Sequence, residues 1–154
     1  MKSEPSVFSI EDLRAQPAGT AGWDGVRNYQ ARNNLRAMRR GDLALFYHSS
    51  AVPTGVAGLM EIVRTAYPDP TQFDEKSPHF EPRASPERPV WLQVDVRFVR
   101  AFTRVLAAAE LKAVPELGDM LLFRSPRLSV QSVSEAEWRD VLKLAESRAG
   151  RSEL

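Results

Sequence analysis

Arginine is concentrated in one short stretch of this chain. Between Gly25 and Gly41 there are five arginines and no acidic residue, although the 154-residue chain has a net charge of only +1. The stretch follows Trp23, which stands between Gly22 and Asp24. Guanidinium groups pair with phosphate oxygens, and an exposed aromatic ring can stack on a nucleobase, which is worth about 1–3 kcal/mol per base. This combination favours a surface that binds nucleic acid.

The arginines recur along one side of a helix predicted over residues 28–40. Ala31, Leu35 and Met38 are spaced i, i+4, i+7 and predict a buried stripe, with the arginines forming a second stripe beside it. A row of like charges is unfavourable within a helix, and bound phosphate would relieve the repulsion. A solvated helix face is the alternative interpretation. The predicted phosphate contacts are Arg27, Arg32, Arg36 and Arg39.

Other chemistries are disfavoured. His48 and Ser49 are adjacent, but neighbouring residues of a strand point to opposite faces and cannot form a nucleophile–base pair. The chain has no cysteine, and its two histidines and scattered carboxylates lack the spacing of metal ligands. Its glycines fit neither of the common phosphate-loop patterns. We therefore predict no catalytic residue, no metal and no cofactor, and keep a hydrolase using His48 or Ser49 as an alternative hypothesis.

Composition suits one packed domain, with 43 % apolar and 27 % charged residues. No apolar run approaches the ~20 residues needed to cross a bilayer, and the first residues lack an apolar signal core. We expect no membrane partner. We predict a cytoplasmic monomer, associated with the nucleoid in a bacterium or located in the nucleus in a eukaryote.

The elements that must position these residues are short and mixed. Ser9 with Asp12, and Ser134 with Glu137, have the spacing of capping boxes and predict helices that begin there. A further short helix is predicted at 106–114. Alternating or apolar runs predict strands over 42–48, 55–64, 90–100 and 127–133.

The connection over residues 65–89 contains six of the 11 prolines. It is too long for an ordinary loop and predicts a functional flap or a loop draped over the surface. Short strands joined by helices and irregular loops indicate an α+β protein with a small mixed barrel rather than a doubly wound sheet. Trp138 is predicted to be core, and Trp91 to be either core or part of a binding site.

Six motifs follow one another along nearly the whole chain. They are KSEP at 2–5, GWDGVRNYQARN at 22–33, GDLALFYHS at 41–49, AYPDPTQFD at 66–74, VDVRFV at 94–99 and RLSVQSV at 127–133. Together they resemble the EVE domain, in the group that includes the thymocyte nuclear protein family. EVE domains belong to the PUA-like superfamily with the YTH and ASCH domains. The resemblance implies a strongly bent mixed β-barrel with surrounding helices over residues 1–146, and we expect a disordered tail over 147–154.

The same resemblance implies a non-catalytic module that recognises a flipped, modified base in an aromatic pocket, above all a modified cytosine such as 5-methylcytosine in DNA. Trp23 and Tyr47 would sandwich the base. The alternatives are a module associated with RNA or tRNA modification, or a small-molecule binder using the same pocket. The pocket residues implied are Lys2, Ser3, Trp23, Asn28, Tyr29, Tyr47, His48, Ser49, Ser129 and Gln131.

Overall fold

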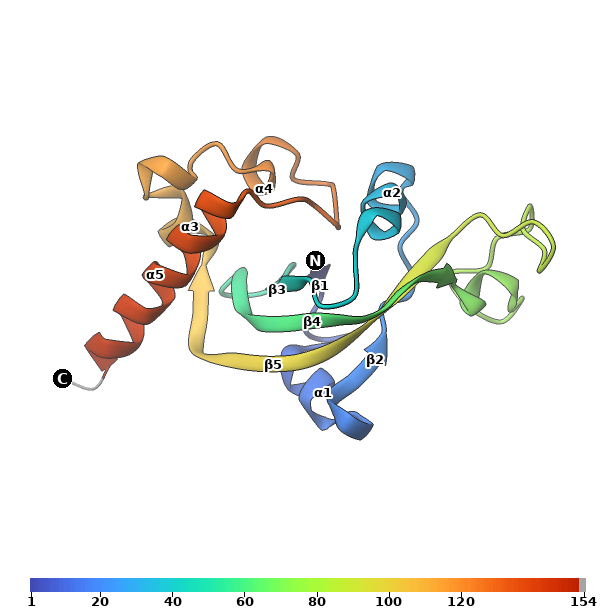
Figure 1. The fold of residues 1–154 in the computed structure, drawn as a ribbon, viewed down its shortest axis with the longest axis horizontal. Helices are drawn as coiled ribbons and strands as arrows, with labels where there is room; N and C mark the ends of the chain where they lie inside the picture. The colour runs from blue at the N-terminus through green and yellow to red at the C-terminus, as the bar shows by residue number, and fades with distance from the viewer. Residues whose placement is uncertain (153–154) are drawn as a thin grey trace.

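The computed structural model describes residues 1–152, with side chains through Ala149. A five-stranded sheet of order β1-β3-β4-β5-β2 forms its centre (Figure 1). Strand β1 pairs parallel with β3 and the other pairs are antiparallel, so the sheet is mixed. The strands are β1 (Lys2–Ser3), β2 (Thr20–Gly22), β3 (Leu43–His48), β4 (Gly55–Pro68) and β5 (Leu92–Ala107).

The two long strands bend the sheet. The register of β4 against β5 shifts at four places, and each bulge adds twist and curvature. At Gly58 a side chain would collide with the carbonyl oxygen of Arg100, so this close approach requires glycine. The predicted α+β class with a bent mixed sheet is confirmed. The sheet remains open, because β1 and β2 are its two edges and do not pair with each other.

Helices cover the bent sheet at different places. The α-helices are α1 (Ile10–Ala15), α2 (Tyr29–Ala37), α3 (Ala108–Lys112), α4 (Leu121–Arg124) and α5 (Glu135–Ser152). Three 3-10 turns accompany them, at Pro17–Gly19, Pro70–Phe73 and Pro115–Leu117. Both predicted capping boxes are present: Ser9 exchanges hydrogen bonds with Asp12, and Ser134 with Glu137.

Several predicted elements differ from the structure. Strands β4 and β5 continue to Pro68 and Ala107, past the predicted residues 64 and 100, and α3 covers only 108–112 of the predicted 106–114. Residues 127–133 form no strand, because the Gln131 side-chain amide donates to the carbonyls of Leu121, Ser125 and Leu128 and folds this segment into a compact loop. Helix α2 ends at Ala37, before the predicted residue 40. Helix α5 runs to Ser152, so residues 147–152 are helical where an irregular tail was predicted, and 153–154 lie outside the described residues.

The core has two parts, one on each side of the sheet. The first contains Trp23 and Phe46 and packs beneath α1 and α2. The second contains Tyr47 and Val141 and packs against α3, α4 and α5, and the partly buried Trp138 contacts it as predicted. The connection between β4 and β5, residues 69–91, projects from the opposite end of the sheet to α5 (Figure 1). We call this connection the flap.

Candidate nucleic-acid interface

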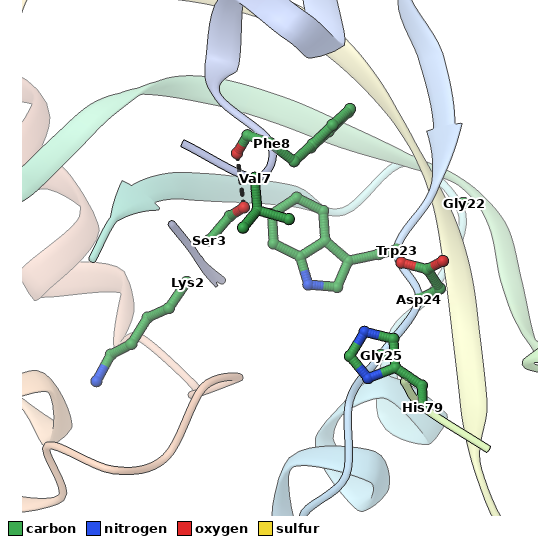
Figure 2. A pocket seen from close by; sticks show the side chains of 9 residues that line it. All are labelled: Lys2, Ser3, Val7, Phe8, Gly22, Trp23, Asp24, Gly25 and His79. Atoms are coloured by element: carbon green, nitrogen blue, oxygen red, sulfur yellow. Dashed lines mark hydrogen bonds between the residues drawn. The ribbon is translucent and has the colours of Figure 1, made fainter. Parts of the chain in front are cut away.

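A pocket of about 370 Å³ opens between the two edge strands of the sheet. Strand β1 supplies one wall, the end of β2 and the following turn supply the other, and the flap contributes one side chain (Figure 2). It therefore lies where a closed barrel would have joined its edges. The lining residues are Lys2, Ser3, Val7, Phe8, Gly22, Trp23, Asp24, Gly25 and His79.

Trp23 belongs both to the core and to the pocket. It is only 7 % exposed and makes edge-to-face contacts with Phe8 and Phe46, at centroid distances of 6.5 and 5.2 Å. Figure 2 shows the nitrogen-bearing edge of the indole turned toward the open space between Lys2 and His79. At this exposure the ring offers the pocket an edge rather than a free face. The predicted stacking wall is thus replaced by an N–H donor, Nε1, which has no hydrogen-bond partner among the described residues.

Asp24, the next residue, presents an acidic side chain to the same pocket. The residue is exposed, and its carboxylate accepts no hydrogen bond from another residue in the described part of the chain. Partial burial and then the neighbouring Asp69 raise the pKa of Asp24, while His79 and Arg27 act in the opposite direction. The carboxylate therefore has spare acceptor capacity that a ligand N–H could use.

Lys2 and Ser3, which were predicted at the mouth of a base pocket, line the wall opposite Asp24. The Lys2 ammonium donates to the carbonyl of Pro126 at 2.7 Å, and burial lowers the pKa of Lys2. The Ser3 hydroxyl donates to the carbonyl of Phe8 at 2.6 Å, so its oxygen can still accept. These contacts place one cation and one acceptor at the rim.

Arg27 holds the flap rather than a phosphate. An arginine has five N–H donors, and Arg27 makes five hydrogen bonds within the chain, at 2.7–3.1 Å. Two reach the carbonyl of His79, and the others reach Asp69, Thr71 and the carbonyl of Val26. No donor is left for a ligand, so the predicted phosphate contact at Arg27 is contradicted by the geometry.

Asp69 is the buried partner that makes this arrangement possible. Its side chain is fully buried and accepts from Arg27, from the Gly25 amide and from Thr71. Burial alone would raise the pKa of Asp69, but the hydrogen bonds from Thr71, Gly25 and Arg27 outweigh it, and the pKa lies below its usual value. The flap is thereby fixed to the turn after β2, with the His79 ring over Gly25, whose φ is +78°.

The predicted residues at the start of α2 face the flap. Asn28 caps the helix by accepting from the Ala31 amide. Tyr29 stacks on Trp91 at a centroid distance of 4.9 Å, and the guanidinium of Arg32 lies over Tyr29, also at 4.9 Å. Arg32 additionally donates to the carbonyl of Val90. Contrary to the prediction, Asn28 and Tyr29 do not line the pocket, and Trp91, which is 5 % exposed, is core.

Strand β3 splits its predicted pocket residues between the two faces of the sheet. Tyr47 points into the second core, where it lines a separate small pocket of about 40 Å³ with Ser129 and Gln131. His48 points the other way, and its Nε2 accepts from the Ile10 amide at 3.1 Å. Burial lowers the pKa of His48, which favours the neutral ring that this bond requires.

The backbone amide of Ser49 donates to the carbonyl of Ser3, which extends the pairing of β3 with β1. None of the five predicted residues Tyr47, His48, Ser49, Ser129 and Gln131 lines the pocket. The predicted Trp23–Tyr47 sandwich is contradicted for the same reason. Adjacent side chains of a strand diverge, so Tyr47 and His48 could never have served one site together.

Arg36 and Arg39 are exposed around the end of α2, and their side chains form no ion pair with any residue through Ala149. They remain free to meet phosphates. Through Ala149, the side chains that the structure describes include no group of His, Asp or Glu arranged to hold a metal. No helix in the same part of the chain is both long enough and apolar enough for a membrane span.

Sequence reasoning missed four side chains of the pocket: Val7, Phe8, Asp24 and His79. Asp24 could have been found, because it stands beside Trp23 in a loop already selected. His79 lies in the proline-rich segment that was predicted as a functional flap, but nothing in its neighbourhood distinguishes it. Val7 and Phe8 look like an ordinary short apolar stretch.

The fold and pocket define a small α+β module with a polar cavity between the edges of a bent sheet. The model of the EVE domain matches residues 1–144, and the chain belongs to the EVE domain family. Human thymocyte nuclear protein 1 is 48 % identical, with 95 % of this chain and 72 % of that protein covered.

Solved structures agree with this assignment. A hypothetical protein from Leishmania major has a TM-score of 0.93 and 51 % identity, covering 96 % of this chain and 93 % of its own. The human THYN1 protein, solved in complex with 5-methylcytosine-containing DNA, has a TM-score of 0.90 and 49 % identity, and 95 % of each chain is covered.

Proposed function

We propose that this chain binds DNA containing 5-methylcytosine and takes the methylated base, rotated out of the duplex, into the pocket between β1 and β2. It recognises the base without altering it. One observation carries the proposal: the pocket occurs in a chain that is 49 % identical to a protein solved with 5-methylcytosine-containing DNA. At about 370 Å³, the pocket lies near the lower end of the range for ligand sites, as a single base requires.

The lining suits one base better than a stretch of nucleic acid. Phe8 and the His79 ring supply flat or apolar walls, while Asp24 and the indole N–H of Trp23 supply polar groups on adjacent residues. Extruding a base costs a few kcal/mol, which contacts inside the pocket must repay. Lys2 at the pocket rim, and Arg36 and Arg39 outside the pocket, are cations that could contact the backbone of the DNA.

Binding of DNA duplexes that differ only in one cytosine, methylated or not, tests the proposal by fluorescence anisotropy. We expect the methylated duplex to bind more tightly, and His79→Ala to weaken that binding about tenfold through lost contact with the base. Phe80→Ala removes the neighbouring, 37 % exposed ring, which does not line the pocket, and should leave affinity unchanged. Equal affinity of the wild-type chain for the two duplexes would refute the proposal.

Base extrusion needs its own measurement. With 2-aminopurine placed next to the 5-methylcytosine, loss of stacking on binding should raise its fluorescence, and His79→Ala should reduce the rise at saturating protein. A methylated duplex that binds tightly without any such rise would mean that the base is read inside the helix. A matched RNA duplex separates DNA from RNA recognition.

A further inference from the structure

Two adjacent residues of the pocket carry hydrogen-bonding groups that the protein itself leaves unused. The carboxylate of Asp24 accepts from no other described residue, and the Nε1–H of Trp23 donates to none (Figure 2). Three other lining side chains keep hydrogen-bonding capacity: the His79 ring, the Lys2 ammonium and the Ser3 oxygen. Asp24 and Trp23 differ from the neutral His79 ring in having one fixed role each, since a carboxylate only accepts and an indole N–H only donates. Several other polar groups are occupied. The Gly25 amide is bound by Asp69, all donors of Arg27 are used, and the Ser3 hydroxyl donates to Phe8. The pocket thus offers a ligand an acceptor of fixed polarity and a donor of fixed polarity on two consecutive residues.

This pair matches one class of pyrimidine. The edge of cytosine carries an amino group, which donates, next to the ring nitrogen N3, which accepts. Thymine and uracil carry the reverse order, a carbonyl oxygen next to an N–H. A carboxylate beside an N–H donor therefore complements the first edge and opposes the second at both atoms.

We propose that Asp24 and Trp23 make the pocket selective for an aminopyrimidine, with Asp24 accepting from the exocyclic amino group and the indole N–H of Trp23 donating to N3. This inference rests on the proposed function and names the residues that determine its base specificity. Asp24 is the specificity-determining residue, and Trp23 is held in orientation by its contacts with Phe8 and Phe46.

The surroundings of Asp24 support this role. Partial burial and the nearby Asp69 raise its pKa, which means that its carboxylate is poorly stabilised in the free protein. A ligand amino group would supply the missing donor. Asp69 cannot replace it as the acceptor, because Asp69 is fully buried and already accepts from Arg27, Gly25 and Thr71.

The sharpest test compares 5-methylcytosine with thymine, which has the same methyl group and the same ring but the opposite edge. Each base is placed opposite an abasic site, so that the cost of breaking a base pair is absent from both probes. We expect the wild-type chain to prefer 5-methylcytosine at least about tenfold. Asp24→Asn, whose amide can either accept or donate, should reduce that ratio to near one.

Asp119→Asn is the matched control. It removes the same charge from an exposed aspartate outside the pocket, and it should keep the wild-type ratio. Retention of the full preference by Asp24→Asn would overturn the inference while leaving the proposed function intact. If the wild-type chain bound neither probe, the proposed function would fall and the inference with it. Equal wild-type binding of both probes would overturn the inference alone.

Discussion

Arg27 illustrates how a residue selected for its charge can have a structural task. All five of its N–H groups are satisfied inside the chain, and its partner Asp69 has no exposed side-chain surface. Arg27→Met removes the five donors while keeping an apolar stem, and it leaves a buried carboxylate without its cation. We expect the free energy of unfolding to fall by about 3 kcal/mol in urea denaturation.

Arg36→Met provides the comparison, because Arg36 is exposed and has no ion-pair partner in the described chain. Its effect on unfolding should stay below about 0.5 kcal/mol. If both variants were equally stable, Arg27 would have no structural role and its assignment as a phosphate contact would return. The sequence could not distinguish the two arginines, since the difference lies in Asp69, which is 42 residues away along the chain.

At the level of elements, His48 joins the start of α1 to the end of β3 through its bond from the Ile10 amide. Burial holds the pKa of His48 below the ordinary 6.5, so the folded chain keeps the ring neutral where the unfolded chain protonates it. The contribution of His48 to the free energy of unfolding is therefore fully present above pH ~6.5. It is lost as the pH falls toward the pKa of the folded state, and the free energy of unfolding then changes by at most about 1.4 kcal/mol per pH unit.

Denaturation midpoints between pH 7.5 and 5.5 measure this linkage. His48→Gln can retain an acceptor without a titrating ring, so we expect its stability to vary less over that window. Phe80→Ala, which removes an exposed ring without a titrating group, is the control and should keep the wild-type dependence. A wild-type dependence that survives in His48→Gln would contradict the assignment.

The elements also show how far pattern alone reaches. Local signals were sufficient for both capping boxes and for the strands that became β3, β4 and β5, because spacing and alternation act within a few residues. The alternating segment 127–133 was misassigned because Gln131 ties it to three nearby carbonyls in place of a partner strand. Whether an alternating segment becomes a strand or a loop depends on which of its groups are buried, and that is set by the rest of the fold.

At the scale of the whole molecule, three segments that are distant in sequence line the pocket: the N-terminal segment, the turn after β2 and the flap. Lys2, Ser3 and Trp23 were predicted through the resemblance. His79 was not, because its approach to Gly25 depends on the clamp formed by Arg27 and Asp69. The pocket could be predicted only in part, since its remaining walls meet through tertiary contacts.

The low net charge of the chain leads to a prediction about how DNA binding depends on salt. A net charge of +1 gives little general attraction to DNA, so a small number of local cations must supply the phosphate contacts. Each such contact contributes about −0.9 to the slope of log K against log salt concentration. We expect Arg36→Gln and Arg39→Gln each to make the slope for a methylated duplex shallower by about 0.9.

Arg139→Gln is the control for this measurement, because Arg139 is exposed on α5, at the end of the sheet opposite the flap. Its removal lowers the net charge equally and should leave the slope unchanged. Arg27→Met should likewise preserve the slope even where it weakens binding, because it acts through the flap. An unchanged slope in both the Arg36 and the Arg39 variant would place the phosphate contacts elsewhere, with Lys2 at the pocket rim as the next cation to test.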